Sequence, residues 1–200
     1  MTLLEQIPAE TFRERSIPVL ETKRLILRAP RLEDAKMVAE LANDRRIAEN
    51  TARIPHPYKL ADAESFIVAA NKPDSEAVFL VTLRDGAVIG ACGVMAIEGQ
   101  ASELGYWLGI AYWGKGYATE AVHAAIDYAF TDLDHAALQA GARVTNPASR
   151  RVLEKCGFQW TGVGLYRIRA LASSAPIDRF RLERGIWASL KSWGRMRKLS

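Results

Sequence analysis

The sequence predicts an α+β (mixed α/β) protein in which a central sheet is flanked by helices. Three strand-like segments at 76–83, 86–97 and 101–110 are joined by short Asp-Gly and Gly-Gln turns, which predicts an antiparallel meander. Apolar residues at helical spacing over 118–130 form the strongest amphipathic stripe of the chain. The predicted order is strand, helix, helix, three strands, helix, strand, helix and strands, which differs from the regular alternation of a doubly wound fold.

Local signals predict the elements on either side of the meander. Alternating apolar and polar residues indicate a strand at 24–30, and a helix with acidic residues in its first turn follows at 32–44. A second helix is predicted at 62–71, where it ends before a proline. Beyond the long central helix, a short buried strand is expected at 136–142.

The last part of the chain begins with a helix that carries clear start and stop signals. Asn146 is the expected N-cap, Pro147 the first helical residue and Gly157 the C-terminal stop. The segments 165–171 and 178–187 are expected to form a closing pair of strands and a last turn or helix.

Length and composition predict one soluble domain. The 200 residues, 49% hydrophobic and 25% charged, suffice for a sizeable core. We expect the domain to span 21–190, between an N-terminal extension at 1–20 and a basic tail at 191–200. No apolar run approaches the roughly 20 residues of a membrane span, and the acidic residues of the extension argue against a secretory signal.

Cysteine usage and charge limit the functional classes. Cys92 and Cys156 are far apart without a C-x-x-C spacing, so we expect neither a disulfide framework nor a metal site, and we expect a cytoplasmic protein. The net charge is +4, and the last ten residues hold four basic side chains and no acidic one. We interpret that tail as a solvated terminus rather than a nucleic-acid surface.

The stretch GIAYWGKGYATEA, residues 109–121, resembles a nucleotide-binding P-loop up to its last position. That position is Gly116, which lacks the hydroxyl that a P-loop uses to hold magnesium, and the antiparallel meander has the wrong topology. The dinucleotide fingerprint also fails, because its third glycine position is Thr119. Both nucleotide interpretations are therefore rejected.

Residues 114–119 can nevertheless receive an anion. Small residues at Gly114, Gly116 and Ala118 let a bulky group approach the backbone, and the first N–H groups of the following helix have no internal partner. Lys115 adds positive charge from the side. A glycine-rich corner without a ligand is the alternative.

The surrounding residues decide between these, because 102–130 closely resemble the signature of the GNAT acetyltransferase superfamily. Its pyrophosphate loop, [QR]-x-x-G-x-[GA], falls on Trp113, Gly116 and Ala118. Trp113 departs from the general motif but is common in the branch similar to the ribosomal-protein N-terminal acetyltransferases of the RimJ/RimL type. Two further blocks resemble the same branch: NPASRRVLEKCGF and ETKRLILRAPRLEDA.

The resemblance implies a splayed sheet and an N-acetyltransferase that uses acetyl-CoA as co-substrate, without a metal. The CoA pantetheine would run between the strand ending at Leu108 and the strand 136–142, and a backbone N–H near Leu108 would bind the thioester oxygen. The pyrophosphate would meet the loop made by Trp113, Gly114, Lys115, Gly116, Tyr117, Ala118 and Thr119.

The resemblance also indicates catalytic residues. Glu103 is the candidate base, and a surface carboxylate at a strand start is the alternative. Many superfamily members use a tyrosine to protonate the thiolate, but Leu153 stands at that position. Ser149 is therefore the expected donor to the sulfur, and Asn146 would contact the pantetheine; their alternatives are a first-turn residue and a helix cap.

Three other reactive side chains receive lesser roles. His123 lies on the polar side of its helix and is expected to be solvated, His56 is a weaker candidate near the acceptor, and Cys156 is expected in the core.

The acceptor is expected to be a primary amine, either a peptide or protein N-terminus such as that of a ribosomal protein, or a small amine. It would be shaped by 50–60 and by the hairpin around 166–182. The alternative is a catalytically weak acyl-CoA-binding or ribosome- or RNA-associated regulatory protein on the same fold. No membrane contact is expected, and the sequence allows a monomer or a homodimer.

Overall fold

The computed structural model describes residues 17–72 and 77–196 of the chain. The expectations for most of the N-terminal extension and for the last four residues of the basic tail lie outside these ranges. Within them, eight strands form one sheet in the order β1-β2-β3-β4-β5-β6-β8-β7. The strands are β1 (Leu20–Glu21), β2 (Leu25–Arg28), β3 (Ala77–Leu83), β4 (Val88–Met95), β5 (Ser102–Leu108), β6 (Ala137–Arg143), β7 (Gln159–Ile168) and β8 (Ser173–Glu183).

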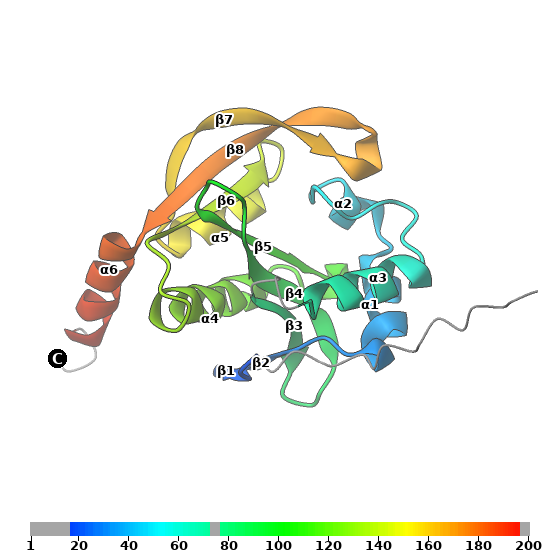
Figure 1. Ribbon diagram of the computed structural model, residues 1–200, viewed down its shortest axis with the longest axis horizontal. Helices are drawn as coiled ribbons and strands as arrows, with labels where there is room; N and C mark the ends of the chain where they lie inside the picture. The colour runs from blue at the N-terminus through cyan, green and yellow to red at the C-terminus, as the bar shows by residue number, and fades with distance from the viewer. Residues whose placement is uncertain (1–16, 73–76, 197–200) are drawn as a thin grey trace, which may run out of the picture.

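Helices cover both faces of this sheet, which confirms the mixed α/β prediction (Figure 1). The α-helices are α1 (Ala35–Ala42), α2 (Arg45–Ala48), α3 (Leu60–Ala70), α4 (Tyr117–Thr131), α5 (Pro147–Lys155) and α6 (Arg184–Met196). The apolar stripe of α4 packs with α5 against one face, where Phe79, Phe130 and Phe180 are almost fully buried. Helices α1 and α3 pack against the other face around Leu80. No helix in the described part of the chain is long and apolar enough to cross a membrane.

The central feature of the sheet is a fork between β5 and β6. Every other neighbouring pair of strands is antiparallel, but β5 and β6 run parallel and pair only at Ser102↔Leu138 and Glu103↔Gln139. Beyond Glu103, β5 stays with β4 while β6 stays with β8. The two strands therefore separate toward their C-terminal ends, as the expected splayed sheet requires.

The closing strands differ from the predicted ranges. β7 begins at Gln159, six residues before the expected start, and the expected strand residues 169–171 form a 3₁₀ turn instead. Most side chains of β7 are exposed, so this strand carries little of the apolar alternation that reveals a half-buried strand. Its pairing with β8 defines it, and that pairing is not visible in the local sequence.

Three further elements refine the sequence analysis. α2 and β1 were not anticipated, because each is only a few residues long. Within the expected closing segment 178–187, the strand ends at Glu183 and α6 begins at the next residue. α6 continues through residue 190, the expected end of the domain (Figure 1). The ring of Trp187 packs on Phe130 with a centroid distance of 5.2 Å, so the start of this helix belongs to the core.

Candidate active site

A cleft of about 400 Å³ lies where β5 leaves β6. The loop before α4 borders one end, the C-terminal part of β5 and the start of α5 form its walls, and residues of and after α2 border the other end. All of the residues that the sequence analysis assigned to the site line this cleft except Lys115 and Glu103. The lining residues that it did not assign include Ile47, Tyr106, Tyr112, Arg151 and Lys155, whereas Asn50 and Thr51 belong to the segment 50–60 that was expected at the acceptor.

The glycine loop turns the start of α4 toward the cleft. Gly114 and Gly116 have φ angles of 73° and 80°, in the left-handed region that favours glycine, and Gly116 is the N-cap of α4. The N–H groups that follow an N-cap have no carbonyl within the helix to bind, and the helix dipole places partial positive charge beside them. The loop therefore presents backbone donors to an anion, with Lys115 exposed at its edge.

Trp113 ties this loop to the end of β5. Its indole Nε1 donates to the carbonyl oxygen of Leu108 at 2.8 Å, while the side chain stays 45% exposed. Trp113, which departs from the general loop motif, thus makes a hydrogen bond to the end of β5. The contact also keeps the loop close to the open edge of β5.

That open edge offers backbone groups to a ligand. The N–H of Gly109 donates to the carbonyl of Ile89 at 2.9 Å, so residue 109 bonds to β4. In an antiparallel pair the bonding direction alternates along the strand, which turns the N–H and C=O groups of Leu108 and Tyr106 away from β4. They face the side that β6 has left, where an extended chain can pair with them.

Arg24, which the sequence analysis did not assign, braces the loop from the far side. Its Nη1 donates to the carbonyl of Lys115 at 2.9 Å, and its Nε donates to the Glu120 carboxylate at 2.7 Å. Its guanidinium also lies 4.6 Å from the ring centroid of Tyr117. One side chain from the start of β2 therefore contacts the loop backbone and the first turn of α4 together. Little in the sequence indicated this role of Arg24, because an arginine beside a strand is usually a solvated residue.

Glu120 is the acidic partner of Arg24, and the contacts of these two residues behind the loop are called the brace below. Partial burial disfavours its charged form, but hydrogen bonds from Thr22 and from the backbone and side chain of Arg24 outweigh that effect and hold the pKa of the carboxyl below its usual value. The carboxylate is thus ionised and paired, and a negative charge in the first turn also suits the helix dipole.

Ser149 and Asn146 meet at the start of α5. The Asn146 side chain accepts a hydrogen bond from the Ser149 N–H at 3.1 Å, so the predicted N-cap is confirmed. The Ser149 hydroxyl lies 2.7 Å from the hydroxyl of Tyr106, which reaches it from β5. Leu153 is fully buried in the core, so no hydroxyl comes from that position. A tyrosine hydroxyl reaches the site from β5 instead.

The cysteines are core residues. Cys156 is buried, and burial raises the pKa of its thiol to about 12. Burial also raises the pKa of the Cys92 thiol. Both side chains therefore stay protonated near neutral pH and are poor nucleophiles. His123 and His56 are exposed, and no group of three or more His, Cys, Asp or Glu within 17–72 and 77–196 could hold a metal ion.

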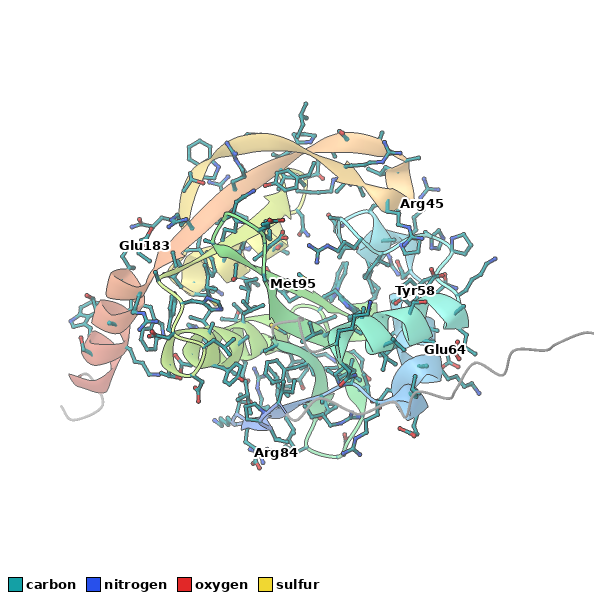
Figure 2. The ribbon with its side chains drawn as sticks, viewed as in Figure 1. Arg45, Tyr58, Glu64, Arg84, Met95 and Glu183 are labelled. Carbon is teal, nitrogen blue, oxygen red and sulfur yellow. The ribbon has the colours of Figure 1, made fainter. Side chains whose placement is uncertain are left out.

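Glu103 lies at the apex of the fork, apart from Ser149. Side chains alternate along a strand, so Glu103 and Tyr106 project from opposite faces of β5. The Glu103 carboxylate pairs with Arg53 at 3.3 Å, and Arg53 also contacts the sulfur of Met95, which lies near the centre of the molecule (Figure 2). The structure thus places the two candidate catalytic residues on opposite sides of the strand at the fork.

Near the end of the cleft remote from the loop, the segment after α2 contacts β6 and the turn between β7 and β8. Arg143, at the end of β6, donates through Nη1 to the Glu49 carbonyl at 3.0 Å. The N–H of Arg169, in the turn between β7 and β8, donates to the Ala52 carbonyl at 3.1 Å. Figure 2 shows Arg45 of α2 below the end of the β7–β8 ribbon. Together with the Arg53–Glu103 pair, these contacts connect the segment after α2 to both halves of the splayed sheet.

Comparison with known proteins identifies the class to which this arrangement belongs. Residues 24–159 match the family described as acetyltransferase (GNAT) domain. The uncharacterized N-acetyltransferase p20 of Bacillus licheniformis is 33% identical over 150 residues, which cover 72% of this chain and 84% of that protein. The chain belongs to the GNAT acetyltransferase family, which confirms the resemblance and identifies it as an enzyme of the transferase class.

Solved structures share the fold across almost their whole length. Spermidine N-acetyltransferase from Vibrio cholerae, in complex with CoA and spermine, has a TM-score of 0.71 at 23% identity and covers 84% of this chain and 99% of its own. RimJ from Mycobacterium smegmatis, in complex with CoA-disulfide, has a TM-score of 0.71 at 19% identity and covers 83% and 86%. RimL, a ribosomal L7/L12 α-N-protein acetyltransferase, has a TM-score of 0.73 at 16% identity and covers 83% and 98%.

Proposed function

We propose that this protein transfers the acetyl group of acetyl-CoA directly to a primary amine, with a peptide or protein N-terminal α-amine as the preferred acceptor. The observation that carries the proposal is the cleft itself, which runs from the glycine-capped start of α4 to the hydroxyls of Ser149 and Tyr106. It offers donors for a pyrophosphate at one end and a polar group for a leaving sulfur at the other.

The cofactor would lie along the open edge of β5. The backbone at Tyr117, Ala118 and Thr119 would bind the pyrophosphate, with Lys115 supplying charge, and the pantetheine amides would pair with the Leu108 N–H and the backbone groups of Tyr106, which face away from β4. In this arrangement the Leu108 N–H is the donor that can polarise the thioester carbonyl. Asn146 stands beside the same path, next to Ser149.

The chemistry needs a base on the amine side and a donor on the sulfur side. The amine nitrogen attacks the thioester carbonyl, the C–S bond breaks with its electron pair on sulfur, and the ammonium formed loses a proton. Glu103 would receive that proton directly or through a water, which is feasible for a weak base because an α-amine has a pKa of about 7.7–8.0. The opposite faces of β5 would keep the base and the sulfur donor apart.

Charge at the acceptor end favours a peptide over a polyamine. Arg53 is 61% exposed beside Glu103, and Arg143 and Arg169 connect the surrounding segments. A polyamine keeps positive charge on its remaining amines, and these arginines repel it. A peptide α-amine lacks that second charge and can offer carbonyl or carboxylate oxygens to them.

The test is release of CoA thiol in the presence of acetyl-CoA and one amine at a time, over N-terminal peptides, spermidine, amino acids and aminoglycosides. We expect kcat/KM for peptides to exceed that for spermidine by about tenfold or more, the factor that 1.4 kcal/mol represents. A preference for spermidine would contradict the peptide assignment while leaving acetyl transfer intact. Tight acetyl-CoA binding without release with any amine would instead favour an acyl-CoA-binding protein.

A further inference from the structure

The Ser149 hydroxyl has a close, partly buried neighbour that the mechanism above does not use. The Tyr106 oxygen lies 2.7 Å from Ser149 Oγ and 3.2 Å from the Ser149 carbonyl oxygen. Both residues line the cleft, and they come from different elements, β5 and α5. The first distance is typical of a good O–H···O hydrogen bond, and the second indicates a weaker one.

The arrangement leaves few choices for the hydrogen atoms. Each hydroxyl has one hydrogen to donate, and burial raises the pKa of Tyr106, so the phenol stays protonated at working pH. If Tyr106 donates to Ser149 Oγ, the serine hydrogen is free for a third group. If Ser149 donates to Tyr106 instead, that hydrogen is occupied and cannot reach a ligand.

We propose that Tyr106 is a positioning residue, which donates its hydroxyl hydrogen to Ser149 Oγ and thereby directs the serine hydrogen toward the sulfur of CoA. This inference rests on the proposed function, since it requires CoA in the cleft. The sulfur leaves as a thiolate with the electron pair of the C–S bond, and the Ser149 O–H stabilises it by a hydrogen bond. No proton passes from Tyr106, and the thiolate later takes its proton from solvent.

The location of the pair agrees with this role. The Tyr106 backbone faces the open edge of β5, along which the pantetheine would lie, and its side chain ends at the first turn of α5. The carbonyl of Ser149 is the competing acceptor for the phenol, but it lies at 3.2 Å against 2.7 Å for Ser149 Oγ, so the shorter contact favours donation to the hydroxyl. Tyr106 thus supplies near α5 the hydroxyl that Leu153 cannot.

The first experiment measures bound CoA directly, without turnover. A free thiol has a pKa of about 8.5. We expect the CoA thiol to titrate below that value when bound, as followed by the ultraviolet absorbance of the thiolate. Tyr106→Phe and Ser149→Ala should each raise the pKa of the bound thiol toward about 8.5. Desulfo-CoA, which lacks the sulfur, should bind the parent and both variants with equal affinity.

The second experiment is a double-mutant cycle in kcat. Ser149→Ala should lower kcat by about tenfold to a hundredfold and Tyr106→Phe by about tenfold, with KM for acetyl-CoA little changed. In the Ser149→Ala background, Tyr106→Phe should have almost no further effect. Tyr128→Phe is the matched control, because it removes a hydroxyl from a partly buried tyrosine of α4 that does not line the cleft.

The outcomes separate this inference from the proposed function. An unchanged thiol titration in folded Tyr106→Phe, or an equal loss of kcat with and without Ser149, would overturn the positioning role. Acetyl transfer that fails with every amine, together with the expected shift in thiol titration, would overturn the proposed function and leave the Tyr106–Ser149 role intact. Thermal unfolding of each variant checks that the protein is folded.

Discussion

The two sides of the candidate site are built in different ways. On the proposed cofactor side, consecutive residues 113–119 present backbone donors, and their geometry follows from two left-handed glycines and a helix start. On the proposed acceptor side, Arg53, Glu103, Arg143 and Arg169 come from four separate segments; Arg53 pairs with Glu103, whereas Arg143 and Arg169 bond to backbone carbonyls of the segment after α2. A backbone site depends on local conformation, whereas a side-chain site depends on how distant segments pack. The first should be sensitive to strain in one loop, and the second to single side chains.

The largest effect should come from Gly116→Val, which tests the proposed cofactor side. A β-branched residue at a φ of 80° is strained by about 1–3 kcal/mol, and relief of that strain moves the loop backbone. We expect acetyl-CoA affinity to fall about a hundredfold, as for two lost charge-assisted contacts of about 1.5 kcal/mol each. Isothermal titration calorimetry measures it.

Gly86→Val is the matched control for that change. Gly86 has a φ of 91° and nothing within 4 Å of its added Cβ, in the turn between β3 and β4. The strain should lower the free energy of unfolding by about 1–3 kcal/mol, as at Gly116, without a change in acetyl-CoA affinity. Equal affinity in both variants would remove the loop from cofactor binding. ATP with magnesium should not compete at this loop, and competition would restore the rejected P-loop interpretation.

A second, smaller effect should come from Glu103→Gln, which tests the proposed acceptor side. We expect kcat at pH 7 to fall by about a hundredfold with little change in acetyl-CoA affinity, as for loss of a general base. The deficit should shrink above about pH 8, because the amine then deprotonates unaided. Glu98→Gln, at an exposed carboxylate between β4 and β5, should leave the profile unchanged. A Glu103→Gln profile with the parent's shape would exclude Glu103 as the base.

The smallest effect should be the pH dependence of stability at the brace behind the loop. Since the pKa of Glu120 is held below its usual value, its stabilisation is fully present above the unfolded pKa of about 4.3 and is lost as pH falls through the folded pKa. We therefore expect Glu120→Gln to lower the free energy of unfolding at pH 7, and the difference from the parent to shrink in acid. Urea unfolding at a series of pH values measures it.

The control for Glu120 is an exposed ion pair of the same chemistry. Glu183 pairs with Arg181 on β8, with both side chains about half exposed, so Glu183→Gln should change stability very little at any pH. A Glu120→Gln deficit that stays constant from neutral to acid pH would mean that the carboxylate charge contributes nothing to the brace.

Local patterns predicted much of the fold and the glycine loop at the start of α4. The stripe over 118–130, the cap at Asn146 and the glycine loop depend on neighbours within a few residues, and such neighbours are visible in the sequence. Leu153 was also visible in the sequence, and it indicated that α5 lacks the tyrosine hydroxyl that many superfamily members carry at this position. That a tyrosine hydroxyl lies beside Ser149 was not readable, because Tyr106 and Ser149 are 43 residues apart and only the packing of α5 beside β5 brings them together.

The sequence by itself determined the class of fold, the helix start that faces the cofactor cleft and the membership in an acetyltransferase family, since each rests on a contiguous block of residues. The tertiary structure decided the start of β7, the brace of Arg24 on the loop, the Tyr106–Ser149 pair and the arginines on the proposed acceptor side. The physical reason is the range of the interactions. Capping and amphipathic patterns act within one element. Strand pairing and side-chain contacts across the fork instead join segments that are far apart along the chain, and no local sequence pattern indicates which of these segments will meet.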